Sequence, residues 1–430
     1  MIKIIHISIF IFFIAQSIFG QVPSPGAPQS QPIVIMNGYA HIGNGEVIEN
    51  ALITFREGKI ENVVDARKVR MDLSDYKKID ASGKHVYPGM ILIGNEIGLR
   101  EIDAIRATRD EKEVGDIKPH VRSAIAYNTD SEIIPTLRFM GIQIAQSVPQ
   151  GGRIPGTSSI MQLDAWNWED AVYKENDAVH LNWPSQTRGP KKGEHGRQDN
   201  ENFVKQKDEV VQLIADTRSY MNSSKSPINL KLEAMVGVVS GEKNLFVRVD
   251  RAEDIIDAIQ TLTKLEIPKV ILIGMRDVLV VKDLVEESGY PVVLDNVHRT
   301  PWRVDEVVDE PYRLPALVHE SGIMSCLSYL TAYEFSSARN LPFLAGTAAA
   351  YGLSKEEALA MVTLNAAKVL GIEDRTGSLE SGKDANIVIS EGDILDMRTN
   401  VILHSFIQGR ELDLEGRQQR LYRKYGAKYE

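Results

Sequence analysis

Residues 359–371 read Leu359-Ala-Met-Val-Thr-Leu-Asn-Ala-Ala-Lys-Val-Leu-Gly371, and residues 377–386 read Gly377-Ser-Leu-Glu-Ser-Gly-Lys-Asp-Ala-Asn386; this stretch decides the fold. A helix begins just ahead of it, because Ser354 is a suitable N-cap and Glu357, three residues on, completes a capping box. The glycines mark turns, and the small residues of the helix favour close packing. Such features set geometry, so the stretch predicts a scaffold and not a chemistry.

Upstream of this stretch, apolar strand-like runs alternate with amphipathic helical segments. An example is the strand-like run 269–273, followed by a helix over 278–288 and a second strand-like run over 290–294. Continuous apolar strands separated by helices are typical of a parallel sheet that is buried on both faces.

The two ends of the chain carry a different pattern. From Ile33 to Val64, short β-rich runs are separated by Gly-containing turns, and strand-like runs return at 385–389 and 401–407. These patterns predict a small antiparallel unit. We expect both ends, residues 33–87 and 385–412, to form one composite β-sandwich beside the main domain.

The N-terminus has the pattern of a secretory signal. Lys3 precedes an apolar run from Ile4 to Ile14, and small residues lead to a Pro/Gln-rich linker over 21–32. A membrane anchor is the other interpretation, but the run is shorter than the roughly 20 residues that span a bilayer. We expect residues 1–20 to be removed on export to a periplasmic or secreted location, leaving no integral membrane segment.

Composition narrows the classes of partner. The 430 residues are 43% hydrophobic and 25% charged, with a formal net charge of −10 at pH 7, which is the balance of a folded and mildly acidic protein. An acidic surface argues against nucleic-acid partners. Cys326 is the sole cysteine of the sequence, so it can form no internal disulfide, and we interpret it as a buried small hydrophobe.

One polar region, about 164–226, interrupts the alternation and carries Trp166, Trp168 and Trp183. We interpret it as an insertion, either an aromatic-lined flap over an active-site mouth or a surface excursion held down by its tryptophans. The C-terminal segment 413–430 is rich in basic residues, and we expect it to form a helical tail.

These segments resemble the amidohydrolase superfamily, and most closely its imidazolonepropionase-like branch. The stretch Ile79-Asp-Ala-Ser-Gly-Lys-His-Val-Tyr-Pro-Gly-Met-Ile91 resembles the family's entry to the first barrel strand, and the opening stretch is similar to its "TxNPAxxLG" and "GSLxxGKxAD" motifs. The resemblance covers nearly all of residues 33–412. It implies an α/β fold, a (β/α)8 TIM-like barrel over 88–384 with a small β-sandwich domain, and a hydrolase of carbon–nitrogen bonds that commonly forms dimers.

The resemblance also implies a divalent metal, held at the carboxyl ends of the barrel strands, that activates water. The family's first pair of ligands is His-x-His after Pro88-Gly89; here Gly94 and Glu96 stand in those places, and Leu92 replaces the usual Asp. At the ends of the fifth, sixth and eighth strands the sequence offers, respectively, Arg248 and Asp250, Met275 and Arg276, and Ser328 and Tyr329, with no acid before Glu334.

The nine histidines are scattered singly, and neither His-x-His nor His-x-x-x-His occurs. We therefore expect no metal centre and no cofactor. The charged residues predicted near the carboxyl end of the barrel are Glu96, Arg248, Asp250, Arg276, Asp277 and His298. They favour one of two interpretations: a salt-bridge network that fills the site, or an arginine-lined pocket for the carboxylate of a small-molecule ligand.

Three functions remain open from the sequence. The first is a pseudoenzyme that binds a ligand, as a homo-oligomer or paired with an active homologue. The second is a hydrolase with a rebuilt site that uses Glu96, Asp250 and Glu334, with zinc as its metal. The third is a metal-free enzyme, such as an isomerase, that uses the carboxylates for proton transfer.

Overall fold

The structure is a computed structural model, and it describes residues 24–190, 196–330 and 335–429. The two ends of the chain meet in one continuous sheet with the strand order β18-β17-β16-β5-β1-β2-β3, and β4 pairs with β1. The pairing of β16 with β5 joins the C-terminal strands to the N-terminal ones. The strands of this sheet are β1 (Ile33–His41), β2 (Val47–Arg56), β3 (Lys59–Asp65), β4 (Lys77–Asp80), β5 (His85–Pro88), β16 (Ile387–Ser390), β17 (Ile402–Ile407) and β18 (Arg410–Glu411).

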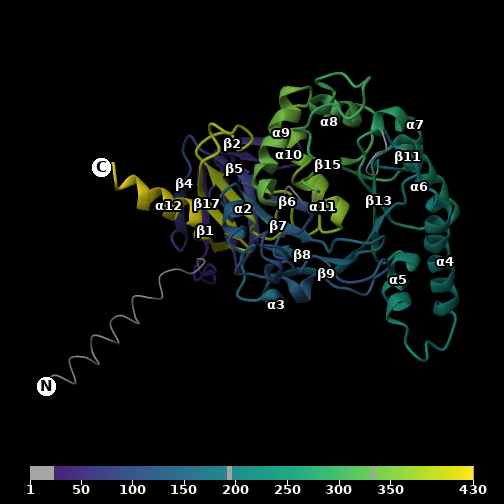
Figure 1. The fold of residues 1–430 in the computed structure, drawn as a ribbon. Coiled ribbons are helices and arrows are strands. Elements are labelled where there is room, and N and C mark those ends of the chain that lie inside the picture. The colour runs from purple at the N-terminus through teal and green to yellow at the C-terminus, as the bar shows by residue number, and fades with distance from the viewer. Residues whose placement is uncertain (1–23, 191–195, 331–334, 430) are drawn as a thin grey trace.

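The central domain is an eight-stranded sheet with the order β15-β14-β13-β12-β9-β8-β7-β6, surrounded by helices (Figure 1). Its strands are β6 (Met90–Asn95), β7 (Ile142–Ser147), β8 (Gly156–Gln162), β9 (Val172–Asn182), β12 (Asn244–Val249), β13 (Val270–Gly274), β14 (Val292–Leu294) and β15 (Ser325–Leu327). The described helices around them are α2 (Ile134–Arg138), α3 (Trp168–Ala171), α4 (Phe203–Met221), α5 (Leu230–Ser240), α6 (Ala252–Lys264), α7 (Lys282–Ser288), α8 (Glu310–Glu320), α9 (Leu341–Ala350), α10 (Lys355–Ala360), α11 (Leu364–Leu370) and, at the C-terminus, α12 (Arg417–Gly426).

The sheet closes into a barrel through side chains and a neighbouring segment. Ser328 Oγ donates to Ile93 O (2.6 Å) and Asn95 Nδ2 donates to Tyr329 O (2.7 Å), which links β6 to the end of β15. At the opposite end of the barrel, the carbonyls of residues 361 and 362 accept hydrogen bonds from β15 and β6. The predicted barrel and terminal β domain are therefore confirmed.

One barrel strand departs from the all-parallel pattern of the prediction. β8 pairs antiparallel with both β7 and β9, whereas the other neighbouring strands pair in parallel. A parallel crossover needs a connection of about a dozen residues or more, and the connections 148–155 and 163–171 are shorter. The reversed strand follows from these short connections.

The prediction of an insertion at 164–226 needs a correction. Val172–Asn182 within it forms β9, the fourth barrel strand, in which residues 177–181 are all buried. The helix α4 then packs on α5 at the end of the molecule far from α12 (Figure 1). Trp183 is buried and its Nε1 donates to Asp257 on α6 (3.1 Å), so it anchors the segment.

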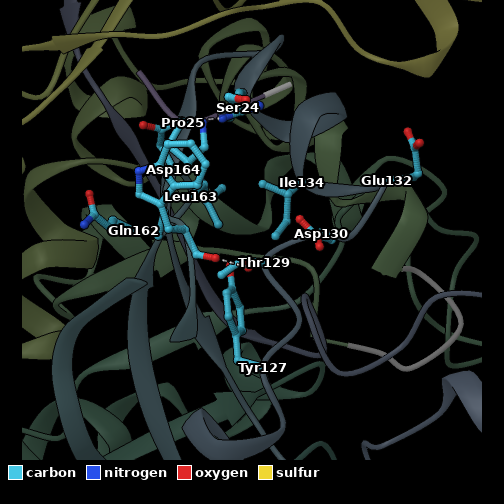
Figure 2. Close-up of a pocket in the computed structure, with 13 residues that line it drawn as sticks. Ser24, Pro25, Tyr127, Thr129, Asp130, Glu132, Ile134, Gln162, Leu163 and Asp164 are labelled. Atoms are coloured by element: carbon cyan, nitrogen blue, oxygen red, sulfur yellow. Dashed lines mark hydrogen bonds and ion pairs between the residues drawn. The ribbon is translucent and has the colours of Figure 1, made fainter. Parts of the chain in front are cut away.

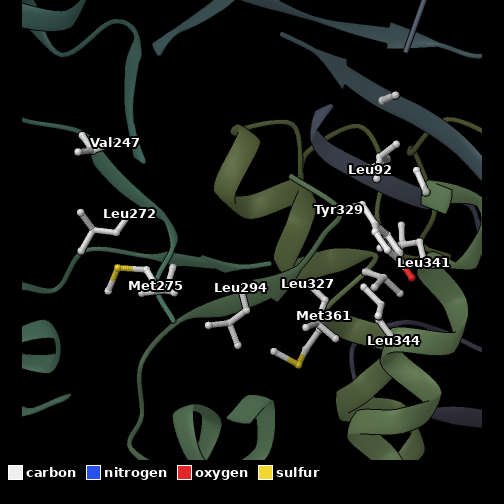
Figure 3. Packing of buried hydrophobic residues seen from close by; sticks show 14 of the residues in the cluster. Leu92, Val247, Leu272, Met275, Leu294, Leu327, Tyr329, Leu341, Leu344 and Met361 are labelled. Atoms are coloured by element: carbon white, nitrogen blue, oxygen red, sulfur yellow. The ribbon is translucent and has the colours of Figure 1, made fainter. Parts of the chain in front are cut away.

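Side-chain alternation along the strands separates two cores. The outer core, between strands and helices, includes Leu92, Leu327 and Tyr329, and Figure 3 shows Tyr329 beside Leu341 of α9. The inner core fills the barrel and includes Ile93, Phe246, Cys326 and Leu330, with Ala366, Ala367, Val369 and Leu370 of α11. The stretch 359–371 thus contains α11, the helix that closes the bottom of the barrel.

No described helix has the length and apolar character needed to cross a membrane.

Candidate functional site

The first metal-ligand position of the family, at the end of β6, has a backbone that disfavours any side chain. Gly94 has φ +69°, and a Cβ there would lie 2.7 Å from Leu330 Cδ2. Its N–H donates to Gln146 Oε1 (3.1 Å), which holds this conformation. A left-handed backbone is unfavourable for most residues other than glycine, so the position suits glycine, and a histidine there would require Leu330 to move.

Leu330, which follows β15, fills the centre of the barrel mouth. Its side chain is 1% exposed and belongs to the inner core. Its N–H donates to Asp295 Oδ1 (2.9 Å), and its carbonyl accepts from Arg248 Nη2 (2.6 Å). Leu330 and Arg248, joined by this hydrogen bond, thus lie near the strand ends where the family would place its general base and one histidine.

Below Arg248 the barrel is almost solid. The cavity lined by Arg248, His180, Phe246 and their neighbours has a volume of about 10 Å³, room for about one water molecule. This cavity is too small for a substrate.

The inner polar groups of β7, β8 and β9 are satisfied by one another. Gln146 Nε2 donates to Asp177 Oδ2 (2.7 Å), Ser158 Oγ donates to Asp177 Oδ1 (2.8 Å), and His180 Nε2 lies 3.0 Å from Ser158 Oγ. Burial raises the pKa of Asp177 to about 6, while burial and the charge of Arg248 lower the pKa of His180 to about 3. His180 is therefore neutral near pH 7, and the network ties strands together. Sequence reasoning assigned no role to these residues, and their place on strands gave no signal of it.

Glu96 is committed to an ion pair of its own. The side chain is 1% exposed and accepts from Arg100 Nη1 (3.1 Å), and Arg100 Nε also donates to Asp103 (2.6 Å). Burial raises the pKa of Glu96, and Arg100 opposes that shift. Glu96 is thus enclosed, and its Oε1 has no hydrogen-bond partner among the described residues.

Asp250 and Arg276 come together beside Asp295, which follows β14. Arg276 Nε lies 3.7 Å from Asp250 Oδ1, and Arg276 Nη2 lies 3.6 Å from Asp295 Oδ2. Burial raises the pKa of Asp250, opposed first by Arg276. The side chains of Asp250 and Arg276 are 33% and 27% exposed, so this cluster is the part of the mouth that solvent reaches.

An aromatic ring completes the cluster. The guanidinium carbons of Arg251 and Arg276 lie 4.9 and 5.0 Å from the centre of the Trp302 ring, within cation–π range. Sequence reasoning missed Arg251, Asp295 and Trp302. Asp295 could have been found, because it directly follows a barrel strand, whereas Trp302 lies in a loop whose path no pattern predicts.

The two other predicted site residues lie elsewhere. Asp277 accepts from Arg303 Nη1 (2.7 Å) and from Ala252 N (3.2 Å), so it fixes the loop to α6. His298 Nε2 lies 2.7 Å from Thr347 Oγ1 and lines a different cavity of about 540 Å³ with Tyr312 and Tyr351. Neither residue joins the Arg276 cluster.

The donor set does not fit the divalent metal that the fold family implies. Across residues 24–190, 196–330 and 335–429, no three His, Cys, Asp or Glu side chains are grouped to hold an ion. The strand ends instead present guanidinium groups, which repel a cation. Glu334, a candidate of the rebuilt hydrolase, lies outside the described residues.

The fold is an eight-stranded barrel beside a terminal β domain, and charged and apolar side chains occupy the ends of its strands. The sequence profile described as "Amidohydrolase family" matches residues 252–412. A segment of 55 residues is 44% identical to a 5-methylthioadenosine/S-adenosylhomocysteine deaminase of Teredinibacter turnerae, and a segment of 38 residues is 60% identical to an imidazolonepropionase of Erwinia tasmaniensis. These matches cover 13% and 9% of this chain, and only 12% and 9% of those proteins.

Solved structures share the fold over most of the chain. An amidohydrolase of Thermotoga maritima superposes with a TM-score of 0.76 at 21% identity, covering 89% of this chain and 99% of that one. A zinc-bound adenosine deaminase of Xanthomonas campestris gives a TM-score of 0.55 at 13% identity, covering 94% of this chain and 100% of that one. Residues 252–412 thus form an amidohydrolase family domain, and these matches support the predicted resemblance to the superfamily and to its imidazolonepropionase-like branch.

Proposed function

We propose that this protein is a non-hydrolytic amidohydrolase that binds a carboxylate-bearing small molecule through Arg276. The observation that carries the proposal is the set of groups at the strand ends. The mouth position that would receive a histidine is shaped for glycine, and Leu330 and Arg248 are bonded across the centre. Hydrolysis by the family's chemistry needs a metal-activated water there.

Arg276 is the group best suited to hold an anion. Its contacts with Asp250 and Asp295 are 3.7 and 3.6 Å, longer than a hydrogen bond, so the guanidinium is not saturated by either carboxylate. Arg248 and Arg251 lie nearby, and Arg251 Nη1 is 3.8 Å from Glu253 Oε1. A ligand carboxylate could bind Arg276 in bidentate fashion through the donors that Asp250 and Asp295 leave unsaturated.

Trp302 suits the rest of the ligand. Its ring contacts Arg251 and Arg276, and it belongs to the loop 299–306, in which Arg299 and Glu306 form an ion pair of 2.8 Å. A planar or apolar ligand body could rest on this ring while the carboxylate reaches Arg276.

A hydrolase with a rebuilt site is the competing function. The raised pKa of Asp250, on a side chain that solvent reaches, is the observation in its favour, since a proton acceptor benefits from a pKa nearer neutrality. It requires activity that a chelator abolishes or that Glu96→Gln removes. The enclosure of Glu96 counts against it.

We also propose that the protein is exported, and that it pairs with an active homologue or with a second copy of itself. Residues 1–20, which would direct export, lie outside the described residues. Cell fractionation and co-purification test these two parts.

Binding of succinate, followed by the fluorescence of the full chain, tests the proposed site. We expect Arg276→Ala to weaken binding about tenfold or more, because a hydrogen bond to a charged group contributes about 1.5–3 kcal/mol. Arg398→Ala is the matched control, since Arg398 is 84% exposed in the terminal domain and pairs with Asp396. Equal affinities for wild type and Arg276→Ala would refute the site, and turnover of an amide substrate that chelation stops would favour the hydrolase.

A further inference from the structure

A second cavity lies outside the barrel, between α2 and the end of β8. Its volume is about 360 Å³, within the range of small-molecule sites. Figure 2 shows Ile134 facing Leu163 and Asp164 across it, with Ser24 and Pro25 at one end and Tyr127 and Thr129 at the other. None of the residues of the barrel mouth lines it.

The floor of this cavity is a buried ion pair with unused donors. Arg138 Nη1 donates to Asp164 Oδ1 (2.6 Å), and the two side chains are 3% and 0% exposed. Asp164 Oδ2 accepts from Gly26 N (3.0 Å), so both of its oxygens have partners. Arg138 Nε and Nη2, and the hydroxyl of the buried Tyr127, have no hydrogen-bond partner among the described residues.

These unused donors point to an acceptor. The Nε and Nη2 atoms form one edge of the guanidinium, the edge that binds a carboxylate in bidentate fashion. A buried donor without an acceptor costs about 1–3 kcal/mol, which an incoming carboxylate would offset. The donors are covered in this conformation, so the carboxylate reaches them through a small side-chain rearrangement.

The rim has the opposite character. The carboxylate of Asp130 is exposed there, and Trp166, which is 68% exposed, also lines the cavity. A carboxylate and an open aromatic face together favour a cation. Between floor and rim, Pro25, Ile134, Leu163 and Ala165 supply apolar walls.

We propose that this cavity binds an apolar amino acid, with its carboxylate at Arg138 and Tyr127, its ammonium group toward Asp130, and its side chain against Ile134 and Leu163. The site is independent of the function proposed for the barrel mouth, because the two share no residue. A ligand of this class matches both ends of the cavity, whereas a simple anion would meet Asp130 and a simple cation would leave the floor donors unused.

Calorimetry and thermal unfolding of the full chain with three probes test the charges. We expect L-leucine to bind and to raise the melting temperature, and L-leucinamide and N-acetyl-L-leucine, which lack one charge each, to bind about tenfold more weakly or less. Absence of leucine binding, or equal binding of either analogue, would overturn the proposal.

Two conservative variants test the residues. Tyr127→Phe removes only the unpartnered hydroxyl, so we expect unchanged or slightly higher stability but an affinity for L-leucine reduced about tenfold. Asp130→Asn should weaken leucine binding while leaving stability unchanged, and Asp305→Asn, at a side chain 80% exposed, is its control. Unchanged leucine affinity in both Tyr127→Phe and Asp130→Asn would contradict the assignment.

Discussion

Gly94→His, which restores the family's residue at the end of β6, is expected to destabilise the protein and to confer no zinc binding. The imidazole would begin from a Cβ 2.7 Å from Leu330 Cδ2, on a backbone with φ +69°. The left-handed conformation costs a non-glycine residue about 1–2 kcal/mol, and overpacking adds about 1–3 kcal/mol. Urea unfolding should therefore show a loss of about 2–5 kcal/mol.

Two further variants separate these causes. Gly94→Ala introduces the strain and the Cβ contact without the imidazole, and it should lose a smaller part of the stability. Adding Leu330→Ala to Gly94→His opens the space around the new side chain, so the cost of the histidine should shrink in that background. A Gly94→His protein as stable as the wild type would show that the mouth is not shaped as described.

Arg138→Met should be the other strongly destabilising change. It leaves Asp164, with a side chain that is 0% exposed, without its partner at 2.6 Å; only Arg410 Nη2, at 3.7 Å, and Gly26 N remain. Breaking a buried ion pair from one side costs about 3–5 kcal/mol because a charge stays buried and unpaired. Urea unfolding at pH 7 measures this loss.

The dependence of the stability loss on pH tests whether the buried charge of Asp164 causes it. Burial already raises the pKa of Asp164, and removing Arg138, which lowers it, raises it further. A carboxyl with a raised pKa in the folded state costs stability above its unfolded pKa of about 3.9, and that cost fades as the pH falls toward this value. The gap between Arg138→Met and wild type should narrow from pH 7 to pH 5. In the double variant with Asp164→Leu, most of the stability should return; a double variant no more stable than Arg138→Met would contradict the ion-pair explanation.

Much of the fold could be predicted because it rests on local signals. The capping box at Ser354 and Glu357 is present, and the small residues after it allow α11 to close the barrel. The reversal of β8 could not be read from apolar runs, because a buried strand has the same composition in either direction. The strand β9 was also missed, because its short buried run lies within a polar region.

The site was only partly predictable from the sequence. Residues that directly follow strands, such as Asp250 and Arg276, could be placed at the carboxyl end of the barrel from their position alone. What they contact depends on loops: Arg303 reaches Asp277 from the segment after β14, and Trp302 reaches Arg276. The role of Leu330 arises from three contacts with distant strands, and its identity as a leucine carries no sign of it.

The metal content of the purified full chain, measured after incubation with zinc and dialysis, tests the central claim most directly. The account predicts far less than one zinc per chain, and no loss of thermal stability on adding a chelator, because Gly94, Leu330 and Arg248 close the metal position. About one zinc or more per chain, retained through dialysis and removed by the chelator with a loss of stability, would contradict it.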